Sequence, residues 1–142
     1  ARRHLSSKYF RATFRISHLT STCIMKTWKL NLYHHIYPYV ASGKKSVEGR
    51  AWSKKRDYRK TQPGDKIVFT DLGSKKKVTA IIDGAKNYKT VKEYLQKEGL
   101  KKCLPWAKSL AEGIGIYYGI AEDWEERIRH GGIFAIRIHL DK

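Results

Sequence analysis

The first 60 residues of this chain contain almost no acid. They hold 15 Lys and Arg but only two carboxylates, Glu48 and Asp57, whereas residues 61–142 hold 15 basic and 11 acidic residues. The whole chain has a formal net charge of +17. Solubility alone rarely needs such a one-sided excess, which is typical of proteins with a polyanionic partner. We therefore expect an RNA partner, structured or ribosomal. Other proteins of a ribonucleoprotein particle are further candidate partners.

Cysteine and long apolar runs are also scarce. The two cysteines, Cys23 and Cys103, are far apart and form no C-x-x-C pair. This pattern indicates neither a disulfide framework nor a zinc site, and we expect no metal and no cofactor. His34 and His35 are adjacent and so cannot easily face one metal; they are interpreted as a helix start or the lining of a groove. No stretch is long and apolar enough to cross a membrane, so no membrane partner is expected.

The N-terminal segment, residues 1–25, is interpreted separately from the rest. Residues 1–24 contain no Asp or Glu and several Arg and Ser. An organellar transit peptide, a basic arm lying along RNA, and added sequence upstream of a start at Met25 all fit this composition. Residues 26–142 are long enough for one domain. The compartment is left open: intracellular, and mitochondrial or in another organelle if residues 1–24 are native.

The hydrophobic pattern of residues 26–142 predicts short strands mixed with short helices. Alternation, or an apolar run beside a turn, predicts strands over 26–32, 46–52, 66–72, 77–82 and 133–140. Helices are expected over 33–42, 90–99 and 121–130, with Gly43, Gly99 and the pair Gly131-Gly132 as their stops. Residues 51–62 form a basic loop, and residues 104–119 give no clear pattern. Five or so strands with short helices indicate an α+β fold, a small mixed β-barrel.

The segment Ser42–Arg50, S-G-K-K-S-V-E-G-R, is the most informative motif. If residues 46–52 form a strand, Glu48 and Arg50 lie on the same face because strand side chains alternate. Together with Lys45 they form a polar cluster. A turn with a solvated ion pair is the alternative interpretation.

A family resemblance becomes specific with a second motif further along the chain, Pro63-Gly64-Asp65-Lys66-Ile67-Val68-Phe69. The combination A-S-G-K-K-S-V-E-G-R, a basic spacer and P-G-D-K-I-V-F resembles the ASCH domain, a family within the PUA-like group of small β-barrels. The resemblance covers roughly residues 26–140. It implies a PUA-like mixed β-barrel of about five strands and an RNA-binding module that recognises an exposed nucleotide.

Under this interpretation the cluster hydrogen-bonds a base edge while the basic loop binds phosphates. Trp52, Tyr58, Tyr88, Tyr117 and Tyr118 are candidates for stacking, although core packing is the alternative for each tyrosine. The predicted nucleic-acid-binding residues are Lys44, Lys45, Glu48, Arg50, Trp52, Lys54, Lys55, Arg56, Tyr58, Arg59 and Lys60.

An enzymatic alternative also follows from the resemblance. Some small ASCH-like proteins are amidohydrolases that deacylate acylated cytidine nucleosides with a lysine, a threonine and a glutamate. Lys45 matches the lysine, but Glu48 stands at the threonine position, and Glu98 is a rough match for the glutamate. A carboxylate at that position would repel a developing oxyanion and keep Lys45 protonated. The binding module is therefore favoured over the enzyme.

Overall fold

The computed structural model describes residues 24–142, so nearly all of the predicted N-terminal segment 1–25 lies outside the described residues. Its single sheet has the strand order β1-β3-β4-β5-β2. The strands are β1 (Thr27–Leu32), β2 (Val47–Ala51), β3 (Lys66–Asp71), β4 (Lys77–Tyr88) and β5 (Ile133–Leu140). β1 pairs with β3 in parallel, and the other neighbours are antiparallel. The predicted α+β fold with about five strands is confirmed.

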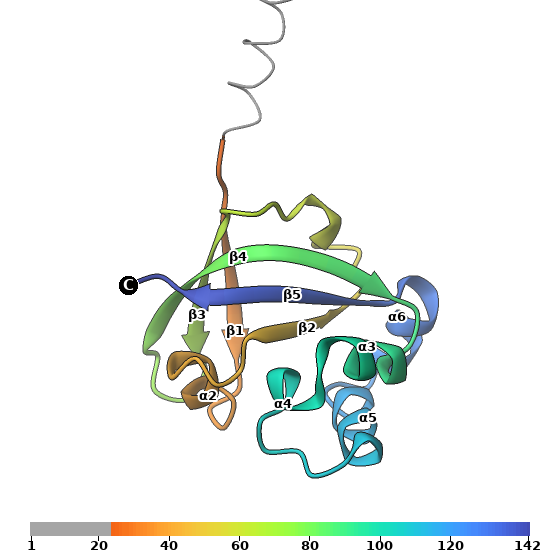
Figure 1. Cartoon of the computed structure of the whole chain (residues 1–142). Coiled ribbons are helices and arrows are strands. Elements are labelled where there is room, and N and C mark those ends of the chain that lie inside the picture. Colours follow the sequence, from red (N-terminus) through yellow and green to blue (C-terminus); the bar gives the residue numbers. More distant parts are fainter. Residues whose placement is uncertain (1–23) are drawn as a thin grey trace, which may run out of the picture.

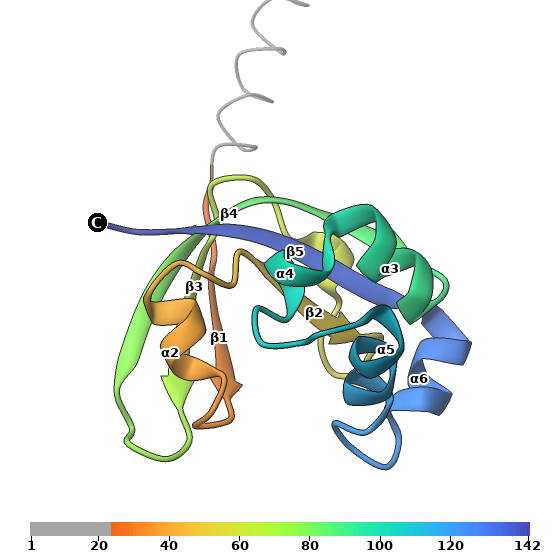
Figure 2. The same cartoon turned by 60° about the horizontal axis from the view of Figure 1, so that its bottom comes forward.

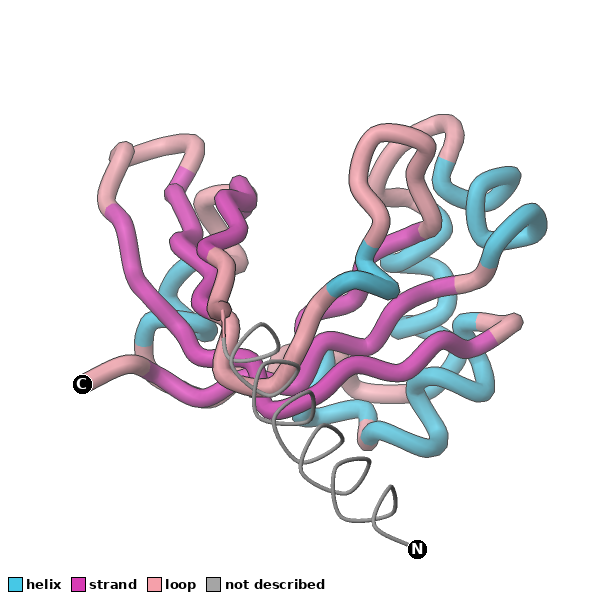
Figure 3. The backbone as a smooth tube through the Cα atoms, turned by 90° about the horizontal axis from the view of Figure 1, so that it is seen from above, coloured by secondary structure: helices cyan, strands magenta, loops and turns pink. Residues whose placement is uncertain are grey.

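The sheet is strongly curled and forms a half-barrel (Figures 1 and 3). β1 and β2 are its two edge strands. The helix α2 (Tyr37–Ala41) lies beside β1 and β3, whereas four helices gather on the other side of the sheet (Figure 2). These four are α3 (Val91–Glu98), α4 (Leu100–Cys103), α5 (Leu110–Tyr118) and α6 (Trp124–Gly131). The molecule therefore has two lobes, joined by β4 and β5.

Two apolar clusters fill the two lobes. Inside the curl, Ile67, Phe69 and Ile136 are fully buried in one cluster. The second cluster lies between the sheet and the four helices, with Tyr94 and Ile133 fully buried in it. Successive β5 residues alternate between the clusters, as the period of a strand requires. β5 therefore contributes to both cores and holds the lobes together.

Asp65 explains why the P-G-D turn belongs to this fold. Its carboxylate accepts hydrogen bonds from the Lys26 amide, the Trp28 indole Nε1 and the Gln62 amide, each at 3.0 Å. The side chain is 1% exposed. Burial alone would raise the pKa of Asp65, but these hydrogen bonds favour the charged form and lower it overall. Asp65 thus fixes the start of β1 beside β3.

Several predicted elements differ in extent from the observed ones. The helix expected over 33–42 is only five residues long, because residues 34–36 form a turn before it. β4 continues to Tyr88 through a register shift between Ile82 and Gly84, since β5 offers pairing partners along its whole length. The basic loop contains a short 3-10 helix, Tyr58–Lys60. α5 arises from the stretch 104–119, which gave no clear pattern, and α4 directly follows Gly99, where a helix was expected to stop.

Candidate functional site at the open seam of the sheet

The half-barrel is open between its two edge strands, and two arginines bridge this seam. Arg50 Nη2, on β2, donates to the Asn31 carbonyl of β1 at 2.8 Å. Arg56 Nη1, in the loop after β2, donates to the Lys29 carbonyl at 2.7 Å. Edge strands leave backbone groups unpaired, and here guanidinium groups satisfy two of them. The side chains hold β1 and β2 together without a hydrogen-bonded ladder.

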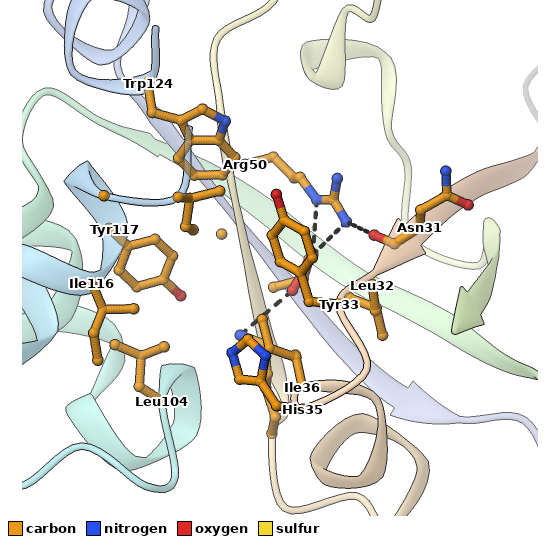
Figure 4. Close-up of a pocket in the computed structure, with 15 residues that line it drawn as sticks. Asn31, Leu32, Tyr33, His35, Ile36, Arg50, Leu104, Ile116, Tyr117 and Trp124 are labelled. Atoms are coloured by element: carbon orange, nitrogen blue, oxygen red, sulfur yellow. Dashed lines mark hydrogen bonds and ion pairs between the residues drawn. The ribbon is translucent and has the colours of Figure 1, made fainter. Parts of the chain in front are cut away.

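A pocket of about 300 Å³ lies at this seam. Figure 4 shows aromatic rings on both of its sides: Trp124 and Tyr117 from the helical lobe, and Tyr33 and His35 from the turn after β1. Ligand pockets commonly combine apolar walls with a few polar groups at fixed positions. The lining residues are Asn31, Leu32, Tyr33, His35, Ile36, Lys45, Glu48, Gly49, Arg50, Leu104, Ile116, Tyr117, Gly119, Ile120 and Trp124.

The predicted polar cluster lies in this pocket. Glu48 Oε2 accepts from Arg50 Nε and forms an ion pair with Arg50 Nη2, both at 2.7 Å. Glu48 Oε1 lies 3.5 Å from Lys45 Nζ. Lys45, Glu48 and Arg50 are therefore brought together as predicted, and Glu48 is the anion that two cations share. The cluster is largely buried, so the alternative of a solvated ion pair is wrong.

Lys45 lies deeper than the sequence suggested. Its side chain is 3% exposed, and Nζ donates to the carbonyls of Val47 and Cys103, each at 2.6 Å. With Glu48 these acceptors match the three donors of an ammonium group. Burial lowers the pKa of Lys45, and the Glu48 carboxylate opposes this shift. The expectation that Lys45 hydrogen-bonds a base directly needs correction, because its donors already serve the fold and position Glu48.

The helical wall of the pocket depends on Gly49. The hydroxyls of Tyr94 and Tyr117 lie 2.8 Å apart, and burial raises the pKa of both well above the ordinary value, so both stay protonated. A Cβ at position 49 would lie 2.5 Å from the Tyr94 hydroxyl and 2.9 Å from the Tyr117 ring. Glycine is therefore the residue that lets Tyr117 approach β2.

Two pocket residues have free polar groups. Among residues 24–142, Trp124 Nε1 has no hydrogen-bond partner. Every buried side-chain nitrogen or oxygen in that range has a partner, so Trp124 Nε1 is not a buried atom. The indole N–H of Trp124 therefore reaches the open pocket, and Figure 4 shows it on the side of Arg50. Arg50 Nη1 likewise has no hydrogen-bond partner within the described part of the chain. Both groups are donors, and they line the same pocket as the Glu48 carboxylate.

Comparison with solved structures now identifies the family. The crystal structure of hypothetical protein PH0355 is 35% identical, with a TM-score of 0.69, and the match covers 81% of this chain and 99% of that one. Protein PF0455 from Pyrococcus furiosus is 32% identical, with a TM-score of 0.61 and coverage of 80% and 96%. The crystal structure of ASCH from Zymomonas mobilis is 16% identical, with a TM-score of 0.56 and coverage of 80% and 67%. The chain belongs to the family of these archaeal proteins and has the fold of an ASCH domain.

The family assignment confirms the resemblance seen in the sequence and the small PUA-like α+β fold that it implied. The sequence matches no protein-family model, and no curated protein matches it. Within residues 24–142 of this ASCH domain no group of three His, Cys, Asp or Glu side chains has an arrangement that could hold a metal ion. No helix in the same range is long and apolar enough to cross a membrane.

The basic loop of the ASCH domain lies beside the seam pocket, because Arg56 contacts β1 two residues from Asn31. The side chains of Lys44, Lys54, Lys55 and Lys60 are exposed. Arg56 is exposed but its guanidinium serves the seam, and Arg59 is paired with Asp57 at 2.8 Å. Lys54 and Lys55 share a second pocket with Asp123 and Glu126, which offset part of their charge.

Several predicted aromatic contacts need correction. Tyr58 is buried in the inner core against Trp28 and Phe134, with ring centroids 6.1 and 5.8 Å away, so it has no face for a base. Tyr88 is buried and its hydroxyl donates to Glu98. Trp52 is half-buried: its indole lies against Gly131, where a Cβ would overlap the ring, and beside His130. Tyr118 is half-buried against the helical core.

Glu98, the third residue of the hydrolase alternative, is not brought to Lys45 and Glu48. Its carboxylate accepts from the Tyr88 hydroxyl at 2.6 Å and from Arg137 Nε and Nη2 at 2.9 and 2.7 Å. It lines a different pocket, with Lys97 and Lys102. Arg137 and Tyr88 lower the pKa of Glu98. The predicted constellation of Lys45, Glu48 and Glu98 is thus separated into two sites.

Sequence reasoning missed Tyr33 and Trp124. Trp124 is the first residue of a helix with an apolar stripe, and this position predicts a core residue. The prediction is largely correct, because Trp124 is only 8% exposed. Tyr33 is 47% exposed and follows β1 directly. The run of aromatic residues Tyr33-His34-His35 was the feature of the sequence that could have indicated Tyr33. The expectation that the two histidines line a groove holds for His35, which lines the pocket.

Proposed function

We propose that this ASCH domain binds RNA and holds one exposed base in the seam pocket. The observation that carries the proposal is the pocket itself: aromatic walls, a buried Glu48–Arg50 pair and a basic loop meet at the opening between β1 and β2. A base outside a helix is recognised by stacking and by polar groups at its edge. This pocket supplies both.

The polar groups of the pocket suit a base edge that has donors and acceptors side by side. Glu48 accepts hydrogen bonds, whereas Arg50 Nη1 and Trp124 Nε1 donate them. Because Lys45 and Asn31 hold Glu48 and Arg50 in place, these groups are oriented before a ligand arrives. Every base has such a mixed edge, so the proposal does not specify which of the four bases the pocket holds.

We assign phosphate binding to exposed lysines in the segments on either side of β2. Lys44, Lys54, Lys55 and Lys60 form no salt bridge with any described residue, and the net charge of the chain favours a polyanion. Such contacts supply affinity without reading the sequence. Four contacts to single-stranded RNA give a slope of log K against log salt of about −3, which is a loss of roughly 50-fold between 50 and 200 mM salt.

Two features weigh against deacylation of acylated cytidine as the main activity. A general base needs a free lone pair, and the three acceptors around Lys45 Nζ favour the charged ammonium group. The carboxylate of Glu98 is engaged by Arg137 and Tyr88 in another pocket. Turnover of such a nucleoside that is lost in Lys45→Met, with the fold retained, would make the hydrolase the primary function.

The proposal is tested by fluorescence anisotropy of the full chain with a labelled single-stranded RNA of mixed sequence, measured from 50 to 200 mM KCl. We expect binding with a salt slope of about −3 or steeper. The double variant Lys54→Ala/Lys55→Ala should reduce the slope by about one or more, because two phosphate contacts are lost.

The matched control is Lys97→Ala/Lys102→Ala, which removes the same charge from the pocket that contains Glu98. It should leave the affinity nearly unchanged. Equal weakening by both double variants would contradict a site at the seam, and no measurable binding at 50 mM KCl would contradict RNA binding altogether.

A further inference from the structure

A row of four aromatic rings continues outward from the seam pocket. Tyr33 and His35 have centroids 6.2 Å apart and nearly parallel planes, at 11°. His35 lies 6.0 Å from Trp106 in an edge-to-face arrangement, and Tyr39 packs on Trp106 at 4.9 Å. We call Tyr33, His35, Trp106 and Tyr39 the aromatic strip. Tyr33 and His35 also line the pocket, so the strip and the pocket are continuous.

The strip joins segments that are distant in the sequence. Tyr33, His35 and Tyr39 belong to the turn after β1 and to α2, whereas Trp106 lies in the connection between α4 and α5. The strip therefore runs from one lobe to the other beside the seam. Packing against Tyr39 holds the Trp106 indole, which is half-buried, while Tyr33 and His35 are exposed.

The rings resemble a stacking surface more than a piece of core. Tyr33 is 47% exposed, and none of the four rings is a buried core residue; Trp106 is only partly buried and packs with one side against the helical core cluster. Aromatic rings next to a basic surface are how proteins bind single-stranded nucleic acid, because every base has a face that can stack. The charge of this chain selects a polyanion over an apolar peptide as the occupant.

Resting on the proposed function, we propose that the aromatic strip is a second subsite, which stacks the nucleotide adjacent to the one in the pocket. The ligand is then a single-stranded RNA segment with two unpaired neighbouring bases. Base-paired RNA does not fit, because its bases are already stacked on one another and its edges are paired. The pocket reads one base and the strip accepts any base beside it.

The test compares ligands of one and three nucleotides on the full chain. Affinities are measured by calorimetry or NMR titration for the four ribonucleoside 5′-monophosphates and for the four homotrinucleotides. Wild type should bind the trinucleotide of its preferred base more tightly than the monophosphate. Trp106→Ala should leave the monophosphate affinity within about twofold and weaken the trinucleotide roughly five- to 100-fold, the range for loss of one stacked base.

Trp106→Phe keeps a ring and should retain most of the trinucleotide affinity, and its thermal transition shows whether the fold tolerates changes at this position. Leu72→Ala, at another exposed apolar residue, is the control and should change neither affinity.

Equal trinucleotide affinity in wild type and Trp106→Ala would overturn the second subsite while RNA binding stands. Equal loss of both ligands in Trp106→Ala would also overturn it, by placing the ring in the pocket itself. Failure of wild type to bind any of these ligands or the longer RNA would overturn the proposed function as well.

Discussion

Arg50 Nη2 donates to the Asn31 carbonyl across the open seam of the half-barrel, at 2.8 Å, while the same guanidinium holds Glu48. One side chain therefore links the two edge strands and orders the polar floor of the pocket. The stability of the seam and the geometry of the site depend on the same residue.

Arg50→Ala should lower the free energy of unfolding by about 1.5–3 kcal/mol, because hydrogen bonds to a charged group are lost. Denaturant unfolding measures this. Arg59→Ala removes an arginine whose side chain is 74% exposed and paired with Asp57, and it should have a much smaller effect because solvent screens an exposed ion pair. Equal effects of the two substitutions would contradict a bridging role for Arg50.

Lys45→Ala should be the more damaging change, with a cost of about 3–5 kcal/mol, the range for breaking a buried pair. It leaves the carbonyls of Val47 and Cys103 without their donor and takes one cation from Glu48. The neighbouring Lys44 is exposed, and Lys44→Ala should change the free energy of unfolding by less than about 0.5 kcal/mol. A thermal transition of Lys45→Ala equal to that of wild type would show that Lys45 does not support the fold.

Gly49→Ala should destabilise the domain by about 1–3 kcal/mol and displace the Tyr117 wall of the pocket, since its Cβ would overlap Tyr94 and Tyr117. Gly115→Ala is the matched control, because a Cβ there meets nothing within 4 Å and the residue lies inside α5. Alanine is a better helix former than glycine, so this control should stabilise the protein by up to about 1 kcal/mol. The same sign for both substitutions, seen in denaturant midpoints, would contradict the packing described for Gly49.

Asp71 should contribute a pH dependence to stability. Burial would raise its pKa, but hydrogen bonds from Ser74, the Gly73 amide and His34 lower it to about 2, below the ordinary value of 3.8. A carboxylate with a lowered pKa stabilises the fold above the unfolded value, and this contribution is lost as the pH falls toward the folded one. Denaturant midpoints should therefore decrease between about pH 5 and pH 2.

Asp71→Asn should reduce this acid dependence. Asp83→Asn changes an exposed carboxylate on β4 and should leave the dependence as it is in wild type. An unchanged acid profile in Asp71→Asn would show that the hydrogen bonds of Asp71 are not coupled to folding.

Much of the fold could be predicted from local pattern. Alternation, or an apolar run beside a turn, indicated all five strands, and Gly43, Gly99 and Gly132 mark helix ends with positive φ angles. The extent of β4 could not be predicted, because its second half is specified by pairing with β5 across nearly 50 residues. α5 contains two glycines and no clear period, and its helix is supported by packing against α3 rather than by propensity.

The site was predictable in its centre and not in its walls. The alternation of a strand places Glu48 beside Arg50 from sequence alone. Burial of Lys45 depends on the Cys103 carbonyl, 58 residues away, which no local pattern shows. No local pattern shows that the indole edge of Trp124 faces the pocket, because its position predicts a core residue. Nor does a local pattern show that Tyr58, an aromatic residue in a basic loop, packs inside the curl.

We propose that the seam pocket receives a base of an RNA. Photo-crosslinking of the full chain to single-stranded RNA containing 4-thiouridine, followed by mass spectrometry of the attached peptides, tests it most directly. We expect crosslinks at Tyr33, His35 or Trp124, reduced in Arg50→Ala and unchanged in Arg59→Ala. Crosslinks confined to the face of Lys97, Lys102 and Arg137, with none at the seam, would contradict it.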